Sequence, residues 1–102
     1  AMNRFAAETI WITGASSGIG KGLALAFAAE GARVVLSGRN RAALDAVAAD
    51  CPGAVVMPFE ATDLDSLPGI VAAVEQATGG ITMLVNNAGI SQRSLALDTQ
   101  FQ

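Results

Sequence analysis

The sequence of 102 residues predicts an α/β fold in which a doubly wound parallel sheet has the strand order 3-2-1-4. Three observations support this prediction. Short apolar, β-branched runs alternate with longer segments rich in helix-forming residues. The runs are apolar almost without interruption, which is typical of strands covered by helices on both faces. A glycine-rich turn joins the first run to the first helical segment, and right-handed crossovers then favour the stated order.

The predicted elements follow one another without a linker or an internal repeat. We expect strands at 9–13, 32–37, 54–59 and 81–86, and helices at 17–30, 41–50 and from Asp65 or Ser66 to Gly79. Asn40 is a suitable N-cap for the second helix. Pro58 has to lie near a strand end or at a sheet edge, because it cannot donate to the ladder. The third helix has a predicted apolar stripe made of Ile70, Val71, Val74 and Ala77.

The composition excludes several classes of protein. With 52% hydrophobic and only 15% charged residues, the chain is apolar for its length, which indicates part of a larger core. A net charge of −3 and the absence of a basic run argue against a nucleic-acid partner, and no membrane span is predicted. The single cysteine, Cys51, excludes an internal disulfide and favours a reducing compartment, so we expect a cytoplasmic protein. Without histidine, no histidine metal site is possible, and we predict no metal site.

The first turn has the features of a phosphate-binding loop. It follows an apolar strand, opens a helix and has the spacing Gly-x-x-x-Gly-x-Gly. A helix N-terminus offers unpaired N–H groups and a partial positive charge to an anion. Glycines there permit a sharp turn, close approach of a pyrophosphate and close helix packing. The predicted dinucleotide contacts in this turn are Gly14, Ser16, Ser17, Gly18, Ile19 and Gly20. Both serines are also suited to capping the helix, and the two roles are compatible.

Two motifs in this sequence resemble the N-terminal signatures of the short-chain dehydrogenase/reductases. They are Thr13-Gly14-Ala15-Ser16-Ser17-Gly18-Ile19-Gly20 and Asn86-Asn87-Ala88-Gly89. The resemblance implies a Rossmann-like, NAD(P)-binding oxidoreductase that interconverts a small-molecule carbonyl and alcohol and forms a dimer or tetramer. It covers essentially the whole chain but only part of the family's domain. We therefore expect residues 1–102 to be the N-terminal part of a single dinucleotide-binding domain.

The end of the second strand bears on the choice between NADP and NAD. A strand selective for NAD typically ends in an acid that accepts hydrogen bonds from the ribose 2′-OH. No acid occurs between Gly31 and Arg41; the strand ends in Ser37, Gly38 and Arg39. Arg39 resembles the arginine of NADP-preferring members of the family, since a guanidinium suits a 2′-phosphate. We predict cofactor contacts at Ser37 and Arg39 and NADP rather than NAD, although an arginine there is ordinarily solvated surface. Arg41 is either a second contact or a solvated helix residue, and we expect the latter.

Two further contact regions are implied by the resemblance. Asp63 and Leu64 match positions that lie beside the adenine, but Asp63 is equally suited to capping the third helix. Asn87, Ala88 and Gly89 follow the fourth strand and would line the cofactor ribose. A polar pair after an apolar strand also requires hydrogen-bond partners, because unsatisfied amides near a core are costly.

The family's catalytic group is not recognisable in these residues. The family uses a Ser, an Asn and a Tyr-x-x-x-Lys motif, whereas this sequence has no tyrosine and only one lysine, Lys21. Ser91 and Ser94 come too early to match the catalytic serine. We therefore predict no catalytic residue here and expect these residues alone to be inactive. The alternative hypothesis is a non-catalytic dinucleotide-binding module that acts as a sensor or an assembly partner.

Overall fold

The computed structural model describes residues 5–59 and 64–87 of the chain. Its elements are β1 (Thr9–Thr13), α1 (Gly18–Ala29), β2 (Arg33–Ser37), α2 (Arg41–Ala48), β3 (Val55–Val56), a 3-10 turn at Leu64–Ser66, α3 (Leu67–Thr78) and β4 (Met83–Asn86). All strand pairs are parallel, and the sheet order is β3-β2-β1-β4. The predicted α/β class and strand order are confirmed.

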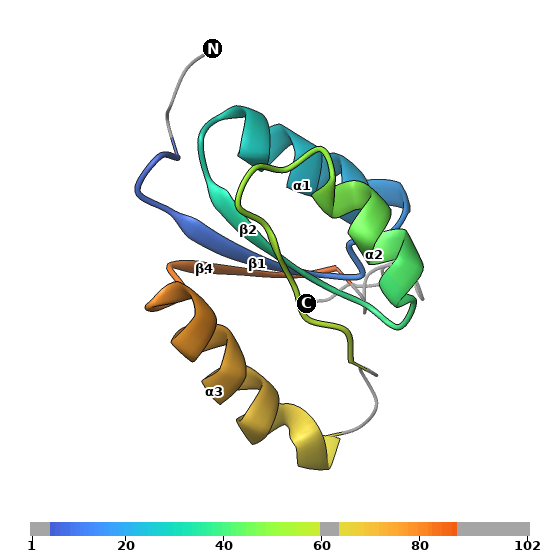
Figure 1. Ribbon diagram of the computed structural model, residues 1–102, viewed down its shortest axis with the longest axis vertical. Helices are drawn as coiled ribbons and strands as arrows, with labels where there is room; N and C mark the ends of the chain where they lie inside the picture. The colour runs from blue at the N-terminus through green and yellow to red at the C-terminus, as the bar shows by residue number, and fades with distance from the viewer. Residues whose placement is uncertain (1–4, 60–63, 88–102) are drawn as a thin grey trace, which may run out of the picture.

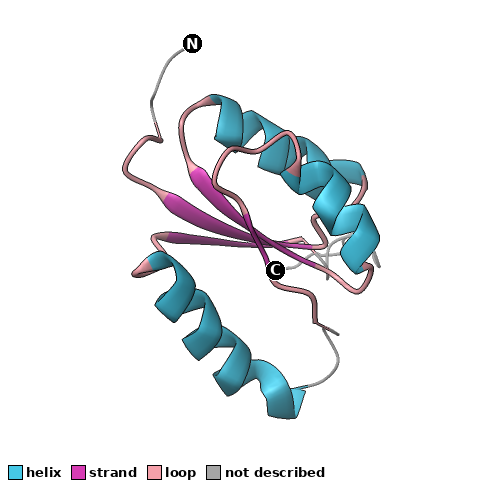
Figure 2. Ribbon diagram, viewed as in Figure 1, coloured by secondary structure: helices cyan, strands magenta, loops and turns pink. Residues whose placement is uncertain are grey.

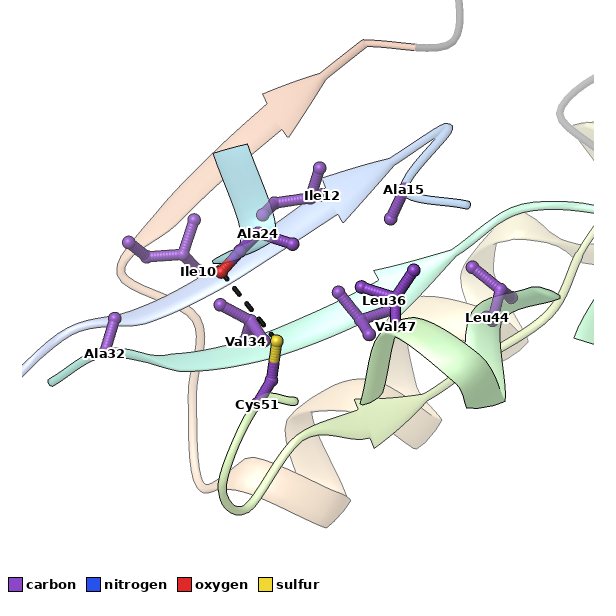
Figure 3. Close-up of a cluster of buried hydrophobic side chains, with 10 residues drawn as sticks. All are labelled: Ile10, Ile12, Ala15, Ala24, Ala32, Val34, Leu36, Leu44, Val47 and Cys51. Atoms are coloured by element: carbon purple, nitrogen blue, oxygen red, sulfur yellow. Dashed lines mark hydrogen bonds between the residues drawn. The ribbon is translucent and has the colours of Figure 1, made fainter. Parts of the chain in front are cut away.

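Helices cover both faces of the sheet. Figures 1 and 2 show α1 and α2 together on one face and α3 on the other. The strand residues alternate accordingly: Ile10 and Ile12 of β1 pack toward α1 and α2, whereas Trp11 packs toward α3. The larger core lies between the sheet and the first two helices, and Figure 3 shows its buried side chains, including Cys51. β1 and β2 are the two inner strands of the described sheet: β1 pairs with β2 and β4, and β2 pairs with β1 and β3.

The third strand is shorter than predicted. Regular pairing with β2 is confined to Val55 and Val56, against the predicted range 54–59. The chain nevertheless stays beside β2, because the N–H groups of Met57 and Phe59 donate to the carbonyls of Leu36 and Gly38 at 2.9 and 3.0 Å. Pro58 lies between these two donors, where its missing N–H removes no bond to β2. Pro58 was expected near a strand end or at a sheet edge, and this is confirmed: it follows the end of β3, which is an edge strand of the described sheet.

The other differences concern element ends and the apolar stripe of α3. α2 ends at Ala48 rather than at residue 50, because the chain tightens there into i→i−3 bonds from Asp50 and Cys51. The predicted stripe of α3 is only partly correct: Val74 is buried, but Val71 is 40% exposed and Ala77 is also exposed. A helix presents one narrow face to a sheet, and here that face runs through Val74 and the half-buried Ile70, four residues earlier.

Candidate functional site: the carboxyl edge of the sheet

Three strands end at the same level of the sheet. In the strand register Thr13, the last residue of β1, is opposite both Ser37 of β2 and Asn86 of β4. The glycine-rich turn begins directly after Thr13. The predicted contact segments that follow these strands therefore meet at the carboxyl edge, where open parallel sheets bind ligands.

The glycine-rich turn depends on two residues in the left-handed backbone region. Gly14 has φ 63° and Gly18 has φ 59°, values that residues with a side chain rarely adopt. A Cβ built on Gly18 would have no atom within 4 Å. Ser17, Gly18 and Ile19 are exposed, and Ile19 is 64% exposed. The turn thus has an open side on which a ligand could approach the backbone.

Gly20 lies on the closed side of the same turn. A Cβ there would overlap the carbonyl oxygen of Gly14 and lie 2.7 Å from Nδ2 of Asn87. That amide group donates a hydrogen bond to the same Gly14 oxygen at 3.1 Å, and Asn87 is only 6% exposed. The absence of a side chain at Gly20 therefore lets α1, the turn and the residue after β4 pack in one place.

The start of α1 is suited to an anion. Ser17 occupies the N-cap position but its side chain makes no capping hydrogen bond, so capping does not account for its hydroxyl. The first turn of α1 contains no acidic residue. By helix geometry the N–H groups of Ile19 and Gly20 have no intrahelical acceptor, and they lie at the positive end of the helix dipole. This arrangement is the one that binds phosphate groups in proteins.

Side chains also join β1 to β4 at this edge. The Thr13 hydroxyl donates to Oδ1 of Asn86 at 2.9 Å, with the Val85 carbonyl oxygen at 3.4 Å. Because Asn87 also donates to Gly14, each of the two amide side chains at the end of the apolar strand has a hydrogen-bond partner, as expected from the sequence. No role for the Thr13 side chain was predicted from the sequence. The feature that could have indicated a role is a hydroxyl at the end of a buried strand, because a buried hydroxyl needs a hydrogen-bond partner.

Ser37 has a different environment from the one its predicted role implies. Its side chain is fully buried; the hydroxyl accepts from Nε1 of Trp11 at 2.8 Å and donates to the Met57 carbonyl at 2.7 Å. Its own carbonyl accepts from the N–H of Ala15 at 3.0 Å. The hydroxyl has used its one proton, so this buried side chain could only accept a bond from a cofactor, with its remaining lone pair. Sequence reasoning missed Trp11, although a tryptophan inside an apolar strand needs an acceptor for its N–H.

Two exposed arginines, two residues apart, follow β2. Arg39 comes two residues after the end of β2, and Arg41 is the first residue of α2. Nε of Arg41 lies 3.7 Å from Oδ2 of Asp45, one turn along the same helix. Between them Asn40 caps α2, accepting from the N–H of Ala43 at 3.0 Å. Arg41 is thus a surface residue of its helix, as expected, and Arg39 is the cation nearest the strand end.

Several predicted contacts lie outside the described residues. These are Asp63, Ala88 and Gly89, so the two interpretations of Asp63 stay open. Leu64 begins the 3-10 turn that leads to Ser66, the N-cap position of α3, where the side chain makes no capping bond. Within residues 5–59 and 64–87, no three His, Cys, Asp or Glu side chains form a metal-binding group. In the same part of the chain, no helix is long and apolar enough to span a membrane.

Comparison with known proteins identifies relatives along nearly the whole chain. The family model for short chain dehydrogenases matches residues 8–102. Dehydrogenase/reductase SDR family member 7 of Homo sapiens is 42% identical over 98 residues, covering 88% of this chain and 29% of the relative. Galactitol 2-dehydrogenase of Agrobacterium fabrum is 48% identical over 80 residues, covering 78% of this chain and 31% of the relative. The chain thus spans about a third of these curated relatives, 29% and 31% of their lengths.

Solved structures agree with this assignment. The citronellol catabolism dehydrogenase of Pseudomonas aeruginosa superposes with a TM-score of 0.80 at 31% identity, over 84% of this chain and 38% of that one. YwfH, an NADPH dependent reductase involved in bacilysin biosynthesis, gives a TM-score of 0.72 at 28% identity, over 76% of this chain and 33% of that one. The sheet order, the glycine-rich turn and these matches lead to one conclusion: the chain belongs to the short-chain dehydrogenase/reductase family.

Proposed function

We propose that this chain is the dinucleotide-binding part of an NADP-dependent oxidoreductase that interconverts a carbonyl and an alcohol. The observation on which the proposal rests is the edge where β1, β2 and β4 end together. There an anion-binding helix start is open on one side at Gly18, and Arg39 follows the neighbouring strand. Membership of the family supports hydride transfer as the chemistry, which the bound nicotinamide would supply.

The residues of this chain would bind and orient the cofactor. The N–H groups of Ile19 and Gly20 are suited to the pyrophosphate, and Gly18 leaves the space that a side chain would fill. Asn87 would act indirectly, by holding the Gly14 carbonyl and so the shape of the turn. We propose that Ser16, Ser17, Ala88 and Gly89 line the ribose and phosphates and that Asp63 and Leu64 lie beside the adenine, as the resemblance implies.

The preference for NADP is assigned to Arg39. A guanidinium pairs with a phosphate through charge-assisted hydrogen bonds, which a ribose hydroxyl cannot match. The segment from Gly31 to Arg41 contains no carboxylate that would accept bonds from a 2′-OH and repel a 2′-phosphate. The likeness to an NADPH dependent reductase is consistent with this choice.

Substrate class, assembly and location follow as coarser proposals. We propose a small alcohol or carbonyl substrate, since one relative is named for its action on galactitol. We also propose a dimer or tetramer and a cytoplasmic location, the latter on the evidence of a buried free thiol at Cys51. Catalytic residues would lie in a Tyr-x-x-x-Lys motif downstream of residue 102, and its presence in the coding sequence would favour the enzyme over a non-catalytic dinucleotide-binding module.

The test compares Arg39→Ala with Arg41→Ala in the full-length protein. The two variants remove the same charge from exposed positions two residues apart, so Arg41→Ala controls for net charge. We expect Arg39→Ala to weaken NADPH binding by about 1.5–3 kcal/mol and to leave NADH affinity nearly unchanged. Arg41→Ala should alter neither. Titration of both cofactors measures this, and an equal loss for both, or none for NADPH, would contradict the assignment.

A further inference from the structure

We propose that Trp11 and Ser37 are positioning residues that set the preference for NADP by holding the strand end that carries Arg39. Both side chains are buried, so the role proposed here is exerted through Arg39 rather than through a side-chain contact with the cofactor. The inference rests on the proposed function, because it assigns these residues a role through Arg39.

The Ser37 hydroxyl connects three segments of the sheet. It accepts a hydrogen bond from Nε1 of Trp11 in β1 at 2.8 Å and donates one to the Met57 carbonyl beyond β3 at 2.7 Å. Trp11 is opposite Val35 in the strand register, so its indole reaches Ser37 diagonally along the same face of the sheet. A hydroxyl with both of its bonds made inside a core has one preferred orientation, and so does the strand that carries it.

This link acts where the regular pairing of β2 with β3 ends. β3 pairs with β2 only through Val55 and Val56. On the side of β3, beyond that point, the end of β2 is held by the Ser37 hydroxyl and by single backbone bonds, among them Phe59 N–H to the Gly38 carbonyl at 3.0 Å. On its other side β2 pairs with β1 as far as Ser37. The ring of Phe59 also lies beside the Trp11 indole, with the ring centroids 6.4 Å apart. Trp11 therefore contacts Ser37 and Phe59, two of the residues that hold the end of β2 before Arg39.

The backbone carbonyl of Ser37 connects the end of β2 to the phosphate-binding turn. The Ser37 carbonyl accepts from the N–H of Ala15 at 3.0 Å, within the glycine-rich turn. Rotation of Ser37 would thus move Arg39 and this turn relative to each other. Charge-assisted bonds to a phosphate are directional, so a guanidinium that is held in place gains more from a 2′-phosphate than one that is not.

The experiment uses the full-length protein with the variants Ser37→Ala, Trp11→Phe and Arg39→Ala, singly and as the pairs with Arg39→Ala. Dissociation constants for NADPH and NADH are measured by the fluorescence of the reduced cofactor, and stability by urea denaturation. Thr78→Ala is the matched control, because it removes a part-buried hydroxyl that donates to the Val74 carbonyl at 2.8 Å, before β4 and away from the carboxyl edge.

We expect Ser37→Ala and Trp11→Phe each to weaken NADPH binding by about fivefold or more, while NADH binding stays within about twofold of the parent protein. In the Arg39→Ala background the same substitutions should cause no further change in the NADPH to NADH ratio. Thr78→Ala should lower stability without changing the ratio. Trp11→Phe keeps an aromatic ring, so it tests the hydrogen bond even where Ser37→Ala fails to fold.

Two results would overturn the inference in distinguishable ways. If Arg39→Ala changes the cofactor ratio but Ser37→Ala and Trp11→Phe alter only stability, the network is structural and this inference alone fails. If Arg39→Ala leaves the ratio unchanged, the NADP assignment itself fails, and the role of Trp11 and Ser37 fails with it.

Discussion

Replacing Gly20 with alanine should damage the fold at the point where α1 meets the glycine-rich turn. The added Cβ would overlap the Gly14 carbonyl oxygen and lie 2.7 Å from Nδ2 of Asn87. The first of these atoms belongs to the backbone, so it cannot move aside as a flexible side chain would. The helix must shift away from the turn, and the hydrogen bond of Asn87 to Gly14 is disturbed with it.

The size of the effect can be estimated from three contributions. Overpacking in a tightly packed site costs about 1–3 kcal/mol. Loss of the Asn87 hydrogen bond adds about 0.5–1.5 kcal/mol. Alanine is the better helix former, which returns about 0.5–1 kcal/mol. We therefore expect Gly20→Ala to lower the free energy of unfolding by about 2 kcal/mol.

Gly22→Ala provides the matched control in the same helix. Gly22 is exposed, and a Cβ there would have no atom within 4 Å, so only the helix-propensity contribution remains. We expect this variant to gain about 0.5–1 kcal/mol. Urea denaturation of both full-length variants measures the difference. A Gly20→Ala protein at least as stable as the parent would refute the close packing of α1 on the turn.

Two further predictions test the open side of the turn and the buried thiol. Gly18→Val and its control Gly53→Val both place a branched side chain at a positive φ, 59° and 74°, where a Cβ has no atom within 4 Å, so both variants incur backbone strain. Only Gly18→Val should abolish NADPH binding. An unchanged affinity of Gly18→Val for NADPH would mean that the phosphate lies elsewhere. Burial, and to a smaller extent the nearby charge of Asp50, raise the pKa of Cys51. Its thiol should therefore stay protonated and react slowly with a thiol reagent at about pH 8 until urea unfolds the protein. Rapid labelling of the native protein would contradict this.

The arrangement of the sheet was predictable because its determinants are local. Apolar runs, glycines at element ends and the handedness of crossovers indicate a doubly wound parallel sheet and favour the observed order 3-2-1-4. The length of β3 was not predictable in the same way. The sequence shows an apolar run through Phe59, but regular pairing ends at Val56, although the N–H groups of Met57 and Phe59 still bind β2.

The environment of Ser37 shows why part of the site could not be predicted. Its place at the end of a strand was clear from the sequence, but the use of its hydroxyl depends on Trp11, 26 residues earlier in the chain. Which pairs of side chains meet diagonally across a sheet depends on the strand register, and the register emerges only when both strands are placed. The same limitation applies to Thr13 and Asn86, which are 73 residues apart.

The glycine-rich turn is consequently not an autonomous motif in this chain. The glycine spacing provides the conformational freedom for a phosphate-binding loop. The shape of the turn depends on Asn87, which directly follows β4 and whose amide donates to the Gly14 carbonyl. Gly20 permits that approach because it has no side chain. A Gly-x-x-x-Gly-x-Gly sequence without a partner for Gly14 would keep the flexibility and lose the fixed geometry. The predictive value of the turn therefore comes from the pair of motifs, because the second motif contributes the residue that closes the first.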